Sequence, residues 1–240
     1  MIFLNNEDVK ALETLLQPFS KKGFEASILH CQKLQRKEAF PLTYGEVEIA
    51  SFTALLKAAG ANEARAFLDL GAGIGRALCA AIWCYPHLKV TGIEIMRELV
   101  DIGRQAIKCV KQARRHRASN VKKIGRIELL TGDFFNPAFH HRISSHDMIW
   151  LSATCFSTEL FQQIANHLSN WAAPRTKLLI LSYALPDPIS YKGNVDGQEK
   201  SIPREKLWRL LGRQNYQMSW SSPDSGVLVH LYEKCPPPFS

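Results

Sequence analysis

The chain has 240 residues, 46% of them hydrophobic, and its 30 Lys and Arg against 22 Asp and Glu give a net charge of +8. Such a chain forms one large globular domain, or one domain with a small appendage. We find no apolar run that approaches the roughly 18 residues needed to span a bilayer, and no signal peptide at the start of the sequence. The six cysteines form no C-x-x-C pair, which predicts free thiols in a reducing compartment, cytoplasmic or nuclear, and no metal site.

The N-terminal segment carries apolar residues at helical spacing as far as about Lys37. This spacing predicts two or three short helices. We expect residues 1–43 to form a helical cap that leads into an ordered loop around Tyr44-Gly45-Glu46. A helix over residues 46–59 follows and ends at Gly60, a residue that favours helix ends.

The middle of the chain alternates between apolar runs and helical patterns. This alternation predicts a parallel sheet covered by helices, in which the buried strands are continuously apolar. The expected strands are residues 66–70, 89–95, 126–131, 147–151 and 177–183.

The end of the sequence has a different pattern. Residues 217–222 and 226–233 are predicted to be two strands joined by a turn. Such a hairpin places an antiparallel edge on the sheet. Residues 186–203, rich in Pro, Gly, Asn and Asp, are long enough for a mobile lid, and residues 236–240 are expected to be a frayed tail.

The most informative motif follows the first predicted strand. Asp69 is followed by Gly71, Gly73 and Gly75 at alternate positions, and a helix then begins. Glycines at a tight turn allow the backbone to approach a ligand that a Cβ would repel, and the helix directs its first N–H groups towards that ligand. Glu94 closes the second predicted strand, where a carboxylate can accept two hydrogen bonds from a ribose diol. The pattern predicts a site for an adenosine-containing cofactor.

Several segments in register resemble the Dot-type family, the "disruptor of telomeric silencing" non-SET protein-lysine methyltransferases of the class I S-adenosylmethionine-dependent superfamily. The order of the motifs holds from about Gly23 to Glu233. The segments that carry the resemblance are Tyr44-Gly45-Glu46, the glycine motif from Phe67 to Arg76, Gly92-Ile93-Glu94, Gly132-Asp133-Phe134 and Ser219-Trp220.

The resemblance implies a Rossmann-like α/β fold with a mostly parallel seven-stranded sheet, an antiparallel C-terminal hairpin and a catalytic domain over residues 44–235. It implies S-adenosyl-L-methionine as cofactor. The amino-acid end of this cofactor would lie near Tyr44 and Glu46. The methionine and ribose would lie on Asp69 and the three glycines, and Glu94 would hold the ribose hydroxyls. Asp133 and Phe134 would hold the adenine, and Tyr44, Ser152 and Trp220 would surround the reaction centre.

Two features depart from this family. Ser152 stands where the family usually has an asparagine, which offers both a donor and an acceptor. A run of eight Lys and Arg without an acid, from Lys108 to Arg126, lies inside the expected catalytic domain. Such a run is a solvated helix face or attracts an acidic or nucleic-acid partner.

The expected activity is methyl transfer to a lysine side chain presented by a protein substrate, with no membrane partner. Two alternatives stay open: an RNA or small-molecule methyltransferase, and a catalytically inactive cofactor-binding protein of the same fold. Secretion into a host cell is a further possibility for a pathogen protein. The sequence does not identify the substrate protein or the oligomeric state.

Overall fold

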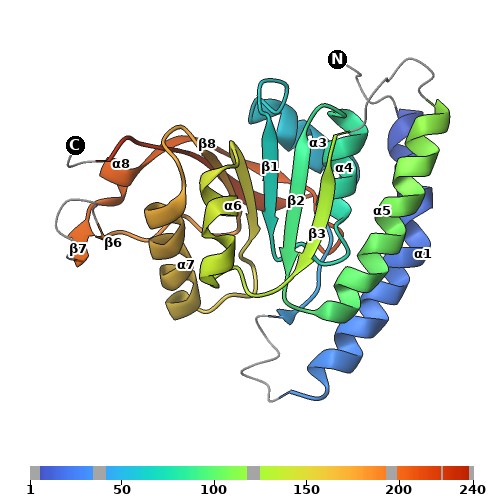
Figure 1. Cartoon of the computed structure of the whole chain (residues 1–240), viewed down its shortest axis with the longest axis horizontal. Helices are drawn as coiled ribbons and strands as arrows, with labels where there is room; N and C mark the ends of the chain where they lie inside the picture. Colours follow the sequence, from blue (N-terminus) through green and yellow to red (C-terminus); the bar gives the residue numbers. More distant parts are fainter. Residues whose placement is uncertain (1–5, 35–41, 118–124, 193–198, 223, 238–240) are drawn as a thin grey trace.

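The computed structural model describes residues 6–34, 42–117, 125–192, 199–222 and 224–237. At its centre lies a seven-stranded sheet with the strand order β3-β2-β1-β4-β5-β9-β8 (Figure 1). Strands β1 to β5 are parallel, whereas β9 runs antiparallel to β5 and β8 antiparallel to β9. The prediction of a mostly parallel sheet with an antiparallel C-terminal hairpin is confirmed. The strands are β1 (Ala66–Leu70), β2 (Lys89–Glu94), β3 (Ile127–Thr131), β4 (Met148–Ser152), β5 (Lys177–Leu181), β8 (Trp208–Tyr216) and β9 (Val227–Lys234).

Helices cover both faces of the sheet (Figure 1). One layer contains α1 (Asn6–Cys31), α3 (Ile49–Ala58), α4 (Arg76–Cys84) and α5 (Arg97–Arg117), and the other contains the short helix η2 (Pro137–Phe139), α6 (His140–Ser144) and α7 (Thr158–Trp171). Each layer packs on its own apolar cluster, because the central strands are buried on both faces. Among the described residues, no helix is both long and apolar enough to cross a membrane.

The N-terminal segment is one helix of 26 residues, α1, so the prediction of two or three short helices is wrong. Pro18 and Gly23, residue types that disfavour a helix interior, lie inside α1 without ending it. Gly23 has a packing role instead: a Cβ there would lie 2.8 Å from Ile74 and 3.3 Å from the Tyr44 ring. Contacts with α5, which lies beside α1 (Figure 1), hold the helix together despite its local breakers.

The predicted hairpin is present, but its first strand is misplaced in the sequence prediction. The strand is β8, residues 208–216, and not residues 217–222. β8 is an edge strand with mostly exposed side chains, so it lacks the apolar alternation that marks a strand in sequence. Residues 217–222 contain instead an isolated bridge between Met218 and Val47.

The segment expected to be a lid is anchored where the structure describes it. Strands β6 (Ile189–Lys192) and β7 (Glu199–Ile202) form a small antiparallel pair, followed by α8 (Arg204–Leu207). Two side chains of α7 hold β6: Asn166 accepts a hydrogen bond from Ser190 N at 3.0 Å, and Asn170 accepts one from Lys192 N at 2.7 Å. Of the expected tail, residues 238–240 lie outside the described residues.

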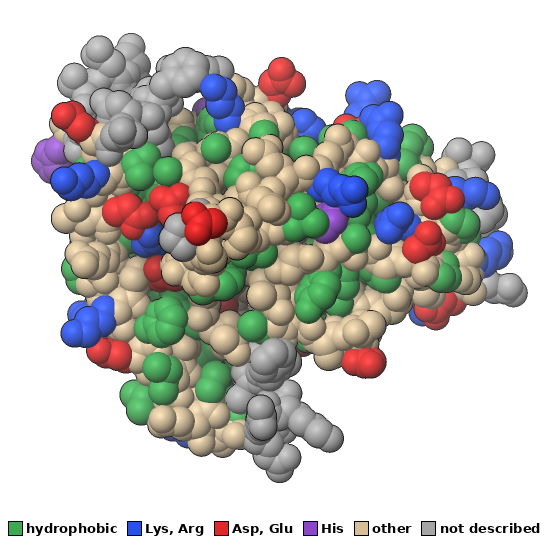
Figure 2. All heavy atoms as spheres, turned by 180° about the vertical axis from the view of Figure 1, so that it is seen from behind, with side chains coloured by type: hydrophobic (Ala, Val, Ile, Leu, Met, Phe, Trp, Pro, Cys, Tyr) green, Lys and Arg blue, Asp and Glu red, His purple; other side chains and the backbone are tan. Residues whose placement is uncertain are grey.

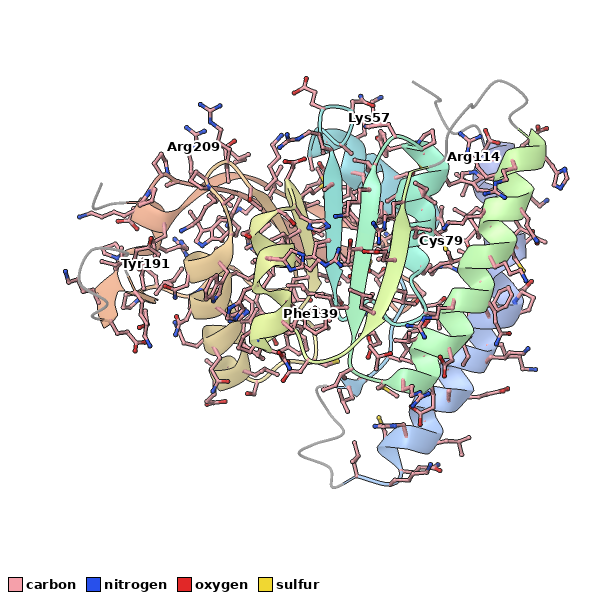
Figure 3. All side chains as sticks on the ribbon, in the orientation of Figure 1. Lys57, Cys79, Arg114, Phe139, Tyr191 and Arg209 are labelled. Atoms are coloured by element: carbon pink, nitrogen blue, oxygen red, sulfur yellow. The ribbon has the colours of Figure 1, made fainter. Side chains whose placement is uncertain are left out.

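The basic run is not one uniform patch. Arg114 is buried: its Nε donates to Trp83 O at 3.1 Å, and its guanidinium lies 5.8 Å from the Trp83 ring centroid. Figure 3 labels Arg114 and Cys79 in this α4–α5 layer. Arg126 pairs with Glu128, while Lys122 and Lys123 lie outside the described residues. Among the basic residues whose side chains the structure describes, Lys108, Lys111 and Arg115 of α5 remain as a candidate contact surface, and the side chain of Arg117 lies outside the described part.

Candidate cofactor and active site

The glycine motif forms the turn between β1 and α4. Gly71, Gly73 and Gly75 have φ values of 79°, 54° and 76°, a region that strongly favours glycine. The N–H groups of Gly71 and Ala72 donate to Ile93 O at 2.9 and 3.1 Å, which ties the turn to β2. Gly71 and Gly73 line the two cavities described below, whereas Gly75 lines neither of them: it precedes α4 and lies near Leu78 and Ile107.

Two buried carboxylates lie below this turn. Glu94 accepts hydrogen bonds from Gly73 N and Met96 N, both at 2.8 Å. Burial raises the pKa of Glu94, while these backbone donors act in the opposite direction. Burial and the nearby charge of Glu94 raise the pKa of Asp69 to about 8. At neutral pH Asp69 is therefore mostly protonated, and a cationic ligand beside it would favour the ionised form.

Two cavities meet above the glycine turn. The larger, about 390 Å³, runs from the turn across Glu94 to Asp133 and Phe134. The smaller lies between Asp69, Glu46 and Trp220. Residues that line both, and so mark their junction, are Tyr44, Gly45, Gly71, Gly73 and Ser152. In Figure 2 the molecule is hollowed on this side, with acidic side chains visible in the depression.

The segment Tyr44–Val47, here called the cofactor loop, forms a wall of both cavities. The Tyr44 ring packs against the glycine turn, since a Cβ on Gly73 would lie 2.5 Å from it. The Tyr44 hydroxyl donates to Glu46 Oε1 at 2.5 Å. Burial, followed by the charge of Glu46, raises the pKa of Tyr44 far above its usual value, so the phenol remains protonated at neutral pH.

A distant part of the chain holds the cofactor loop from the other side. Ser219 N donates to Glu46 O at 3.1 Å, and Glu46 N donates to Ser219 Oγ at 3.3 Å. The Trp220 ring covers Gly45, where a Cβ would lie 2.7 Å from it, and Trp220 keeps 42% of its surface exposed. Residues 217–222 therefore build the site, although they do not form the predicted strand.

The far end of the larger cavity follows β3. Asp133 Oδ1 accepts from Phe135 N at 2.9 Å, which fixes a tight turn. The half-buried Phe134 lies next to Phe135, with ring centroids 4.9 Å apart. Apart from Gly75, every residue predicted for the site lines one of the two cavities. Sequence reasoning missed Met96, Leu99, Leu160 and Gln163 on the cavity wall, and Arg76 at the small cavity.

Comparison with known families gives a match over most of the chain. Residues 24–227 match the family described as "Histone methylation protein DOT1". The chain belongs to the DOT1 family. A search of curated proteins gave no significant match.

Solved structures similar to this DOT1 family member share its fold at low identity. A mitomycin 7-O-methyltransferase, MmcR, has a TM-score of 0.53 and 14% identity over 83% of this chain and 57% of that chain. A point mutant of MtNAS has a TM-score of 0.51 and 14% identity over 97% of this chain and 78% of that chain. An RNA methyltransferase from Salinibacter ruber, in complex with S-adenosyl-L-homocysteine, has a TM-score of 0.51 and 17% identity over 78% of this chain and 92% of that chain.

Membership of the DOT1 family makes the chain an S-adenosylmethionine-dependent methyltransferase, and the cavities fit this cofactor. The volume of the larger one lies in the range of small-molecule sites. Gly71 faces open space, with no atom within 4 Å of a Cβ placed there, so the backbone is accessible to a ligand. Two buried carboxylates complement a ligand with cationic groups. Within the described residues, no cluster of three or more His, Cys, Asp or Glu could hold a metal ion.

Proposed function

We propose that this DOT1 family member is a protein-lysine N-methyltransferase. The observation that carries the proposal is the composition of the smaller cavity beside the junction. It combines an aromatic wall, Trp220, with the carboxyl groups of Asp69 and Glu46 and the hydroxyl of Ser152; Arg76, which also lines it, pairs with Glu46 and leaves Asp69 without a cationic partner there. An aromatic face and carboxylates attract a cation such as a lysine ammonium. Trp220 is also partly exposed, so a side chain from another protein can reach it.

In this proposal the protein's own residues bind, orient and exclude water. Glu94 would hold the ribose hydroxyls, and Asp133 with Phe134 would hold the adenine. When bound, the cofactor supplies an activated methyl group on a sulfonium with a good leaving group. The chain must align the acceptor nitrogen with that methyl and keep water out.

The acceptor lysine must lose its proton before it can attack, because its pKa in water is about 10.4. Removal of water from the ammonium lowers that pKa, whereas the carboxylates and the Trp220 face that attract the cation act in the opposite direction, so the proton must leave before the amine reaches the methyl group. Tyr44 directs its hydroxyl to Glu46 and is held protonated, which makes it a wall of the site in this mechanism rather than a base. Ser152, at the junction of the two cavities, can accept a hydrogen bond from the incoming amine.

The test is methyl transfer from labelled S-adenosylmethionine into a cell lysate, with and without RNase, followed by mass spectrometry. We expect label on lysine in defined proteins, insensitive to RNase. Glu94→Ala should abolish it, whereas Glu98→Ala, an exposed glutamate on the first turn of α5, should retain it.

Other outcomes would replace the proposal. RNase-sensitive label would favour RNA as the substrate, and label in small molecules would favour a metabolite. Cofactor binding without any transfer would indicate an inactive family member. The sequence carries six cysteines but no C-x-x-C pair, which also leads us to propose a reducing compartment, the cytoplasm or nucleus. Contact of Lys108, Lys111 and Arg115 with an acidic or nucleic-acid partner is likewise a proposal.

A further inference from the structure

An ion pair between α1 and α4 lies next to the site and joins Arg76, the last residue of the glycine motif, to Glu13, which belongs to no motif. Arg76, the first residue of α4, is only 9% exposed. One of its guanidinium nitrogens, Nη2, binds Glu13 of α1, and another, Nη1, donates to Ser20 Oγ at 3.3 Å. Arg76 thus attaches the N-terminal helix to the end of the glycine turn.

The same guanidinium holds the cofactor loop. Arg76 Nε donates to Val47 O at 2.8 Å, and Nη1 lies 3.5 Å from Glu46 Oε2. Glu46, itself 8% exposed, uses its other oxygen to accept from the Tyr44 hydroxyl. A chain of charge-assisted contacts therefore runs from Glu13 through Arg76 and Glu46 to Tyr44. Contacts of this kind are about twice as strong as neutral hydrogen bonds.

Glu13 has a second contact, just after the loop. Its Oε1 accepts from Ile49 N at 3.3 Å, at the start of α3. One pair of side chains consequently holds the C-terminal end of the loop, Arg76 at Val47 and Glu13 at Ile49, where the chain enters α3. Glu13 itself lines neither of the two cavities above the glycine turn.

Helix α1 also contacts the Tyr44 ring directly. Phe24 meets it edge to face, with centroids 5.5 Å apart, and the ring lies against Gly23. On its other side the ring contacts Gly73 of the glycine turn. A displacement of α1 or Arg76 would therefore reach the backbone that forms the cofactor cradle.

From these contacts we propose that Glu13 and Arg76 are positioning residues that set cofactor affinity through the Glu46–Tyr44 pair. The N-terminal helix thereby becomes part of the cofactor site rather than an external cap. Neither side chain needs to touch the cofactor for this effect, because both act on the loop that forms the cavity wall. This inference rests on the use of S-adenosylmethionine and is independent of lysine as the acceptor.

The test is a double-mutant cycle on the binding of S-adenosylhomocysteine, measured by titration calorimetry at a temperature where all variants are folded. The variants are Glu13→Gln, Tyr44→Phe and the two combined. We expect Glu13→Gln to weaken binding by about tenfold, the size typical of losing one hydrogen bond to a charged group. In the Tyr44→Phe background the same change should weaken binding by less than about threefold, because the chain of contacts is already broken.

Controls separate this role from a general loss of stability. Glu233→Gln removes the ion pair with Arg209 on β8 and β9 and should leave the affinity unchanged. Should Glu13→Gln not fold, Arg76→Lys takes its place in the same cycle, and Glu13→Asp should recover part of the affinity. The proposal is overturned if the affinity is unchanged in both Glu13→Gln and Arg76→Lys, or if the two effects in the cycle simply multiply. Because only binding is measured, failure of the lysine proposal would leave this result intact.

Discussion

Replacing Gly73 with alanine should destabilise the protein much more than the same change at Gly71, although both glycines have positive φ. An alanine in this region costs roughly 1–2 kcal/mol of backbone strain. At Gly71 this is the whole cost, since the new Cβ meets no atom within 4 Å. At Gly73 the Cβ would lie 2.5 Å from the Tyr44 ring, so the ring must move.

The additional cost can be assigned to the contact that Tyr44 loses when it moves. Its hydroxyl donates to the Glu46 carboxylate at 2.5 Å, and a hydrogen bond to a charged group contributes about 1.5–3 kcal/mol. Gly73→Ala should therefore lower the free energy of unfolding by about 2.5–5 kcal/mol in total. Gly71→Ala should lower it by about 1–2 kcal/mol.

Urea denaturation of the cofactor-free protein measures these values. The decisive variant is Gly73→Ala combined with Tyr44→Ala, which removes the ring before the Cβ is added. In the Tyr44→Ala background we expect Gly73→Ala to cost only the strain, about 1–2 kcal/mol. Equal costs for Gly71→Ala and Gly73→Ala, or a Gly73→Ala cost that stays the same without the ring, would refute the contact between Tyr44 and the glycine turn.

Three further predictions concern charge and burial. Burial and the charge of Glu94 raise the pKa of Asp69 to about 8, so the ionised fraction of Asp69 grows as the pH rises through 8. The binding of cationic S-adenosylmethionine should therefore tighten from pH 6.5 to 8.5. Calorimetry should show a weaker pH dependence of this affinity in Asp69→Asn. Burial lowers the pKa of Lys234 to about 8, so the unfolded chain binds more protons than the folded one between about pH 8 and 10.4. The free energy of unfolding should therefore rise with pH in that window. Urea denaturation at pH 7.5 and 10 should show this rise in the unchanged protein and not in Lys234→Met. Trp208 Nε1 donates to the buried Ser169 Oγ at 2.7 Å, and Trp208→Phe should lower the free energy of unfolding by at least about 1–3 kcal/mol while leaving the affinity for S-adenosylhomocysteine unchanged, because neither residue lines the cofactor cavities.

The parallel strands were predictable because their signal is local. β1 is buried at every position and reads as one apolar run that ends at a glycine, which leaves little choice of boundary. β8 was not predictable in the same way, because it pairs on one side only and exposes most of its side chains. Its sequence therefore carries neither a continuous apolar run nor a strict alternation.

The same distinction applies to the site. Asp69 lies in the first predicted strand, Glu94 lies in the second, and Asp133 follows the third. Parallel strands bring their carboxyl ends to one edge of the sheet, so these three residues could be expected to lie near one another. Arg76 and Glu13 are separated by 63 residues, and no spacing rule connects a helix at the start of the chain with the glycine turn. The role of Gly23, which is to admit the Tyr44 ring, is likewise a contact that depends on the folded structure.

The contact between Glu46 and Ser219 has a consequence for biosynthesis. These residues lie 173 positions apart, and a chain emerges from the ribosome N-terminus first, at about 5–20 residues per second. The glycine turn and Glu94 are therefore made long before the segment that covers Gly45. In a nascent chain that lacks Met218 to Trp220 the contacts of this segment with Gly45 and Glu46 cannot form, so the loop gains this support only after residue 220 has been made.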